Sequence, residues 1–264
     1  KWLGAFAHVD EVWVPSTFVQ DAVAAVSPVP VFKIPHAIVC RPSAQASRAR
    51  FGLPDRVMLA LVMYDFHSYQ YRKNPQAAIA AFRLAAREHA NLGIVVKTIN
   101  GQRYPEALAE LKASVADLPH AYFIDDFLSR QETWDLQACC DVLLSLHRAE
   151  GFGLAPAEMM ALGKPVVATG WSANTDFMRD GNSFPVRYQL KPLEHDVGAY
   201  PAGPVWAEAD VEHAAWCLGQ IASRPDLARE MGARAAADIR QQLSPVAVGS
   251  MARDRLALVL RWLA

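Results

Sequence analysis

Two glutamates and two glycines stand close together in the segment EGFGLAPAE, which begins at Glu150 and ends at Glu158. The segment lies between a strand-like run and a helix-like run, and ligands of open α/β sheets bind where strands end. Gly151 and Gly153 let the backbone approach a ligand, and amides at a helix start favour an anion such as a diphosphate. We place Glu158 in the first helical turn, where a carboxylate is stabilised and could bind a ribose diol. Glu150 could reach a sugar instead.

The same segment also has a purely structural interpretation. In that interpretation the two glycines make a tight turn, and Glu158 is a carboxylate that caps the following helix. A lone Gly-x-Gly pattern favours the structural interpretation. The spacing of these residues therefore predicts a site only when other features support it.

A second segment, Tyr64–Pro75, carries cations and hydroxyls and again runs from a strand end into a helix. Arg72 and Lys73 come just before the helix, and Ser68 lies a few residues upstream. Such groups bind an anion at a helix N-terminus. The alternative is that Arg72 and Lys73 form a solvated pair beside a helix cap.

Further polar residues follow other predicted strands. Lys97 lies in the apolar pattern IVVKT, where a charge is rarely buried without a partner; it either faces the diphosphate or extends to solvent from the strand end. Ser172 and Asn174 could hydrogen-bond sugar hydroxyls or form a turn. His147 closes a strand, and a lone histidine there is more often a satisfied strand-end residue than a catalyst.

An alternation of apolar β-rich runs and amphipathic runs positions these residues. Apolar runs such as Val142–Leu146 are typical of parallel strands covered by helices on both faces. The sequence therefore predicts an α/β fold with a Rossmann-like, doubly wound parallel sheet. The predicted strands are Val57–Tyr64, Gly93–Ile99, Ala121–Asp125, Asp141–His147 and Pro165–Thr169. The predicted helices are Pro75–His89, Pro105–Leu118, Gln131–Cys140 and Leu154–Leu162, and three more begin near Asp210, Pro225 and Pro245.

Capping signals support several helix starts: Asn74 before Pro75, a capping box from Ser129 to Glu132, and Ser244 before Pro245. Residues 191–204 are predicted to be irregular because they are rich in proline and glycine.

The first 34 residues follow a different pattern, with short strands at Val12–Val14 and Val29–Ile34 around a helix at Thr17–Val26. We interpret residues 1–40 as a remnant of a preceding domain with its linker; an edge of the main sheet is the alternative. Residues 41–243 are the predicted main domain, and residues 244–264 a C-terminal helix that packs back on the preceding domain. Because the chain starts with Lys1, we expect that it was trimmed upstream.

Composition excludes several classes of protein. The 264 residues carry a formal net charge of −1, which supplies no electrostatic footprint for nucleic acid. No apolar stretch approaches the roughly 20 residues that span a bilayer. The four cysteines lack CxxC spacing, and no set of residues has convincing metal-ligand spacing. We expect a reduced, cytoplasmic protein without structural zinc.

The segment EGFGLAPAEMMALGKPVVATGWSANTDFM, from Glu150 to Met178, resembles the Glu-x7-Glu segment of family 4 (group 1) retaining glycosyltransferases. Arg72-Lys73-Asn74 resembles the family's basic segment, and DEVWVPS, from Asp10 to Ser16, resembles the end of its N-terminal domain. The resemblance implies that the chain is the C-terminal, nucleotide-sugar-binding half of a GT-B fold with an N-terminal remnant.

The resemblance also implies roles for individual residues. Glu150 lies at the donor sugar and Glu158 at the nucleotide ribose, and Lys73 binds the pyrophosphate; Glu150 and Lys73 are the catalytic candidates. The remaining donor-binding candidates are Ser68, Arg72, Lys97, Gly151, the backbone amides of Phe152, Gly153 and Leu154, and the side chains of Ser172 and Asn174. Many family members have a further basic residue where this chain has His67 and Ser68, so Ser68 or Arg72 replaces that phosphate contact.

The implied activity is transfer of a sugar from a nucleoside diphosphate to an acceptor hydroxyl, with retention of configuration and without a cofactor or obligatory metal. A glycan or lipid-linked acceptor would bind through the missing N-terminal domain, so this fragment alone is expected to be inactive. The expected role is cell-surface glycan synthesis, at the inner face of the membrane. The alternatives are a non-catalytic nucleotide-sugar-binding module and another GT-B enzyme, such as an epimerase or a phosphorylase.

Overall fold

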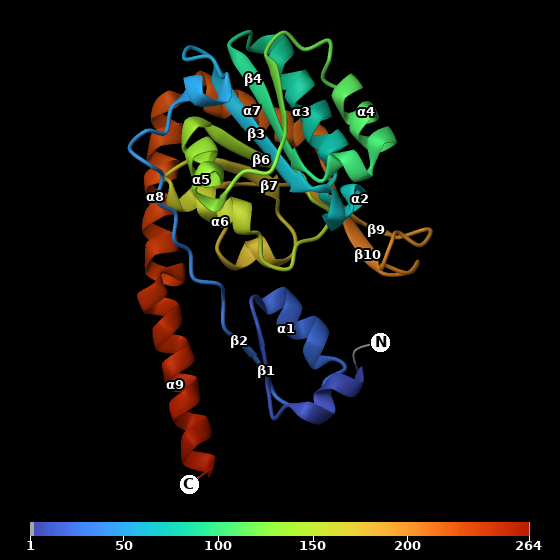
Figure 1. Cartoon of the computed structure of the whole chain (residues 1–264), viewed down its shortest axis with the longest axis vertical. Coiled ribbons are helices and arrows are strands. Elements are labelled where there is room, and N and C mark those ends of the chain that lie inside the picture. The colour runs from blue at the N-terminus through green and yellow to red at the C-terminus, as the bar shows by residue number, and fades with distance from the viewer. Residues whose placement is uncertain (1–2, 264) are drawn as a thin grey trace.

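The computed structural model describes residues 3–263, and within them the main sheet has six parallel strands in the order β5-β4-β3-β6-β7-β8 (Figure 1). The predicted α/β, doubly wound fold is confirmed. The strands are β3 Met58–Asp65, β4 Leu92–Ile99, β5 Ala121–Asp125, β6 Val142–Ser145, β7 Val166–Thr169 and β8 Phe184–Val186. Residues 1, 2 and 264 of the predicted terminal segments lie outside the described residues.

Helices cover both faces of this sheet, because its strands are apolar on both sides. Along β3, Ala60 and Val62 face one core, whereas Leu59 and Leu61 face the other. One core is covered by α3 Pro75–Glu88, α4 Pro105–Ala113 and α7 Val211–Ser223. The other is covered by α5 Arg130–Cys139, α6 Leu154–Ala161 and α8 Pro225–Leu243. This two-sided burial is the main source of stability for a doubly wound sheet.

The order of the strands reverses beside β3. The chain builds outward from β3 through β4 to β5 and then returns to the other side of β3 to form β6. At such a reversal the loops after neighbouring strands diverge to opposite faces, and the carboxyl ends of the strands border a crevice. The segments after β3 and β6 carry the two constellations singled out in the sequence.

The N-terminal residues form a separate unit. Strands β1 Val12–Val14 and β2 Val31–Lys33 pair in parallel with each other, on either side of α1 Thr17–Ala24. The alternative that they form an edge of the main sheet is wrong. The division of the chain at residues 40 and 243 stays a prediction.

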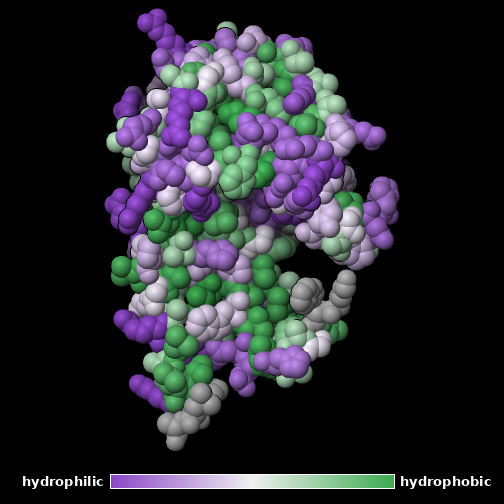
Figure 2. Space-filling model, viewed as in Figure 1, coloured by the Kyte–Doolittle hydropathy of each residue, from purple (hydrophilic) through white to green (hydrophobic). Residues whose placement is uncertain are grey.

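The last helix, α9 Pro245–Leu263, extends from the main body beside the N-terminal unit (Figure 1). Arg255 forms an ion pair with Glu11 at 2.5 Å and lies over the ring of Phe32. Apolar side chains gather over this lower part of the molecule (Figure 2). Among residues 3–263, no helix has both the length and the apolar character required to cross a bilayer.

Some local predictions fail. An antiparallel hairpin of β9 Tyr188–Pro192 and β10 Val205–Ala209 brackets residues predicted to be irregular, and α4 ends before the predicted Leu118. The capping box at Ser129 is confirmed, and Ser244 accepts a hydrogen bond from the amide of Ala247. Asn74 instead adopts a left-handed conformation, with φ of 50°, and its side chain does not cap α3. Short 3-10 helices occupy Leu3–His8, Arg48–Phe51, Phe66–Ser68, Gly101–Arg103 and Ala173–Asp176.

A glycine in α8 sets how closely this helix approaches the end of α6. A Cβ atom added at Gly232 would lie 1.9 Å from the carbonyl oxygen of Gly163. Both partners are backbone, so neither can move aside cheaply. In α9, by contrast, a Cβ atom at Gly249 would meet nothing within 4 Å.

We therefore expect Gly232→Ala to destabilise the protein by about 1–3 kcal/mol, because overpacking outweighs the better helix propensity of alanine. Gly249→Ala, the matched control, should stabilise by about 0.5–1 kcal/mol. Urea unfolding followed by circular dichroism measures both. Equal effects of the two substitutions would show that the close packing of α6 and α8 is not a stability constraint.

Candidate functional site

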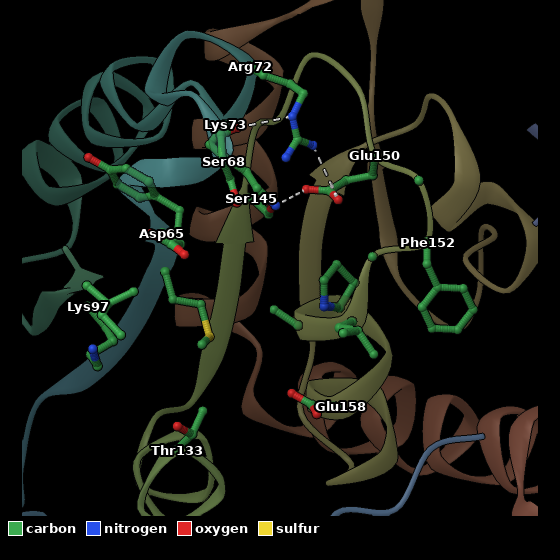
Figure 3. A pocket seen from close by; sticks show the side chains of 18 of the residues that line it. Asp65, Ser68, Arg72, Lys73, Lys97, Thr133, Ser145, Glu150, Phe152 and Glu158 are labelled. Carbon is green, nitrogen blue, oxygen red and sulfur yellow. Dashed lines mark hydrogen bonds and ion pairs between the residues drawn. The ribbon is translucent and has the colours of Figure 1, made fainter. Parts of the chain in front are cut away.

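A cavity of about 650 Å³ opens at the carboxyl ends of β3, β4 and β6, where the strand order reverses (Figure 3). Most of the predicted site residues line it. These are Ser68, Arg72, Lys73, Lys97, Glu150, Gly151, Phe152, Gly153, Leu154 and Glu158.

Lys73, Arg72 and Glu150 form a charged cluster on one side of the cavity (Figure 3). Lys73 ends the short helix α2 Gln70–Lys73, and its Nζ donates a hydrogen bond to the Glu150 carboxylate. The Arg72 guanidinium donates to the carbonyl oxygen of Ala149 at 2.7 Å and lies 3.6 Å from Glu150 Oε2. Arg72 and Lys73 are thus held at the cavity and are not a solvated pair.

The charge on Glu150 is set by its neighbours. Burial would raise the pKa of this carboxyl group, but the nearby positive charge of Lys73, with a smaller contribution from the Arg72 guanidinium, holds it below its ordinary value. The backbone amide of Glu150 donates to Ser172 Oγ at 2.8 Å, which fixes the start of the loop. Glu150 is therefore an oriented anion at neutral pH.

The glycine loop after Glu150 is held in one shape. Gly153 has a φ of +91°, which a side chain would strain, and a Cβ atom there would lie 3.3 Å from Asn174. The carbonyl of Gly151 accepts a hydrogen bond from Ser16 Oγ at 2.8 Å. Helix α6 starts at Leu154, and the first amides of a helix lack partners within it. The loop can thus present amides to an anion in the cavity.

Glu158 does not lie in the first turn of α6, as predicted, but is the fifth residue of that helix. The amides at the helix start are therefore not what stabilises its charge, and it is not a capping carboxylate. Its side chain is 3% exposed. Arg130 and Gln137, both from α5, hydrogen-bond its two oxygens.

Lys97 lines another part of the cavity, away from Lys73 and Glu150 (Figure 3). Its Nζ donates to the carbonyl oxygens of Thr98 at 2.5 Å and Asp126 at 2.6 Å. Burial lowers the pKa of Lys97, and the negative charge of Asp125 opposes that effect in part. The structure does not bring Lys97 to the charged cluster expected at the diphosphate.

Unlike Lys97, Ser172 and Asn174 do not line the cavity. Ser172 accepts the Glu150 amide, and Asn174, fully buried, donates to the carbonyl of Thr169 at 2.9 Å and lies 3.0 Å from His147 Nε2. Burial lowers the pKa of His147. These side chains hold the loops together, so the alternative interpretations of a turn and of a satisfied strand-end histidine describe them better.

Sequence reasoning missed several lining residues, above all Arg130, Thr133 and Tyr200. Arg130 directly follows the capping residue Ser129, after a predicted strand end, and this position is a signal that could have found it. Tyr200 belongs to the turn of the unpredicted hairpin. Among residues 3–263, no group of three or more His, Cys, Asp or Glu side chains could hold a metal ion; independence of metal stays a prediction.

The buried charge cluster has a consequence for stability. Glu150→Gln should lower the free energy of unfolding at pH 7 by about 1–3 kcal/mol, because Lys73 and Arg72 lose the charge that compensates them. The pKa of Glu150 is lower in the folded state than in the unfolded state. Its charge therefore stabilises the folded protein at pH values above the unfolded-state pKa, and this contribution is lost as the pH falls through the folded-state pKa. The difference from wild type should therefore shrink between pH 7 and pH 3.

Urea unfolding at pH 7, 5, 4 and 3 measures this difference, with Glu110→Gln, an exposed residue of α4, as the control. A Glu150→Gln penalty that stays constant with pH, or that Glu110→Gln reproduces, would contradict the assigned electrostatics.

The sequence matches a known family over its central half. Residues 60–192 match the family model described as Glycosyl transferases group 1. The chain is 30% identical over 199 residues to the D-inositol 3-phosphate glycosyltransferase of Streptomyces scabiei. That match covers 73% of this chain and 40% of the relative.

The fold is similar to those of larger proteins. Sucrose-phosphate synthase from Thermosynechococcus elongatus has a TM-score of 0.72 and 16% identity, covering 99% of this chain and 61% of that one. Anabaena HepE, solved with UDP and glucose, has a TM-score of 0.73 and 16% identity, covering 94% and 63%. The chain thus spans less than two thirds of each of these proteins. The similarity in fold confirms the expected likeness to the Rossmann-like C-terminal half of a GT-B fold.

Proposed function

Since this chain belongs to the group 1 glycosyltransferase family, we propose that its cavity binds the nucleoside-diphosphate sugar from which the enzyme transfers a sugar to an acceptor hydroxyl. The observation that carries the proposal is the arrangement of one cavity, with Lys73, Glu150 and the glycine loop on one side and Glu158 on another. That arrangement matches a diphosphate sugar joined to a ribose.

Charge complementarity supports the following roles. Lys73 and the amides of the glycine loop stabilise the negative charge of the departing diphosphate. Glu150, an anion beside them, positions the sugar and stabilises positive charge at the anomeric carbon. Glu158 accepts hydrogen bonds from the ribose hydroxyls.

In the proposed reaction the bond between the anomeric carbon and the diphosphate oxygen breaks, and a bond to the acceptor oxygen forms on the same face of the sugar. The proton of the acceptor hydroxyl passes to the leaving phosphate oxygen. Because the new bond forms on the face from which the diphosphate departs, the configuration at the anomeric carbon is retained, as in family 4. Lys73 is close enough to Glu150 to be shared between that carboxylate and an incoming phosphate. No metal takes part in this proposal.

The remaining parts of the proposal concern the whole enzyme. The acceptor, a cell-surface glycan or a lipid-linked sugar, would bind to a further N-terminal domain, at the cytoplasmic face of the membrane. The chain spans 40% of its relative from Streptomyces scabiei. We therefore expect this chain to bind the donor with little or no transfer of its own.

Calorimetric titration with UDP, GDP and dTDP tests donor binding. One of the three should bind saturably, and both Lys73→Ala and Glu158→Ala should weaken it about tenfold or more, because each removes a hydrogen bond to a charged group. Binding should be the same in EDTA. UDP is the first ligand to try, since Anabaena HepE was solved with it.

Lys164→Ala and Glu110→Ala are the matched controls, because neither residue lines the cavity. Absence of binding by all three nucleotides, or equal loss in the controls, would count against the proposed donor site. Sugar transfer by a protein that joins this chain to an acceptor-binding N-terminal domain separates an enzyme from a non-catalytic binding module. The anomeric configuration of its product, measured by NMR, tests retention.

A further inference from the structure

Glu158, the proposed ribose ligand, is held from two points on the neighbouring helix α5. Arg130 donates to its Oε1, and Gln137 Nε2 donates to its Oε2 at 2.9 Å. Arg130 is the first residue of α5 and Gln137 lies two turns further on. One helix therefore fixes both oxygens of a carboxylate that belongs to another.

The carboxylate requires such partners because of where it lies. Only 3% of the Glu158 side chain is exposed, and its place beyond the first turn of α6 removes it from the free amides of the helix start. A buried charge without partners is costly. Arg130 supplies the positive charge, and Gln137, itself fully buried, supplies a second donor.

The two contacts leave room for a ligand. A carboxylate offers about four lone-pair sites, two on each oxygen. Arg130 and Gln137 each use one, so each oxygen keeps a site that a sugar hydroxyl can use. A ribose presents two neighbouring hydroxyls, which is the pattern that two oxygens in fixed positions accept.

Arg130 is placed to hold this geometry. Its guanidinium lies 5.3 Å from the ring centroid of Trp134, one turn further along α5, and its side chain lines the cavity with 56% of its area exposed. A cation stacked on an aromatic ring has a restricted orientation. Arg130 therefore lies between the solvent and a buried carboxylate, at the edge of the ligand site.

We propose that Arg130 is a positioning residue for the ribose: it orients Glu158 so that both carboxylate oxygens accept the ribose hydroxyls. This inference rests on the proposed donor site. It assigns Arg130 an effect on recognition of the sugar hydroxyls, and none on recognition of the diphosphate, which the charged cluster around Lys73 provides.

Titration of UDP and GDP, each beside its 2′,3′-dideoxy counterpart, isolates the contribution of the two ribose hydroxyls. The sugar of dTDP lacks the 2′-hydroxyl, so dTDP is titrated beside its 3′-deoxy counterpart and tests the remaining hydroxyl alone. For the nucleotide that wild type binds, removing the hydroxyls should weaken binding at least about tenfold. The hydroxyl ratio is the dissociation constant of the nucleotide without the hydroxyls divided by that of the nucleotide with them. In Arg130→Met this ratio should fall to about threefold or less, while the dissociation constant of the nucleotide without the hydroxyls changes less than twofold. Arg130→Lys, which keeps the charge, should recover part of the ratio.

Arg179→Met is the matched control, because Arg179 also joins a largely exposed guanidinium to a partly buried carboxylate, Asp238, but lies outside the cavity lining. It should leave the ratio unchanged. If Arg130→Met weakens the binding of both nucleotides equally, Arg130 contacts the phosphates instead. If it raises the ratio, Arg130 competes with the ribose for Glu158. Either result overturns this inference but leaves the proposed donor site standing. No binding by wild type would overturn the proposed donor site and this inference together.

Discussion

The compensation of two carboxylates, one buried and one largely buried, governs the construction of this site. Glu150 and Glu158 belong to one short segment after β6, but each receives its positive charge from a different neighbour. Lys73 follows β3 and Arg130 follows β5. A buried charge that loses its partner is strongly destabilising. The two ion pairs therefore join the segments that follow β3, β5 and β6, at the edge of the sheet where the strand order reverses.

Local patterns sufficed for most of the sheet. The strand Ala121–Asp125 has its predicted bounds, and the starts of α3 and α9 lie at the prolines that mark them. The hairpin of β9 and β10 escaped prediction because its pairing joins residues on opposite sides of a stretch rich in proline and glycine. Asn74 illustrates a second limit, since the same residue that caps a helix also tolerates the left-handed conformation that it adopts here.

In the site, too, local motifs predicted some residues, whereas contacts between residues distant in the sequence were not predicted. The family-like motifs led to Lys73, Glu150 and Glu158, which share one cavity. Arg130 was not found, because its partner lies 28 residues away on another helix. Ser172 and Asn174 were predicted to lie at the sugar because of the family resemblance and their hydrogen-bonding groups, but those groups bond within the loops themselves. Residue type alone does not say which partner a polar group has.

The hydroxyl of Ser16 joins two parts of the molecule that the chain separates by 135 residues. It accepts the amide of Val19 and so starts α1, and it donates to the carbonyl of Gly151 in the glycine loop. A rotation of the N-terminal unit must therefore carry the loop with it or break this bond. The bond therefore couples the angle of the N-terminal unit to the shape of the loop, and a ligand that favours one loop shape favours the matching angle by at most the free energy of this bond.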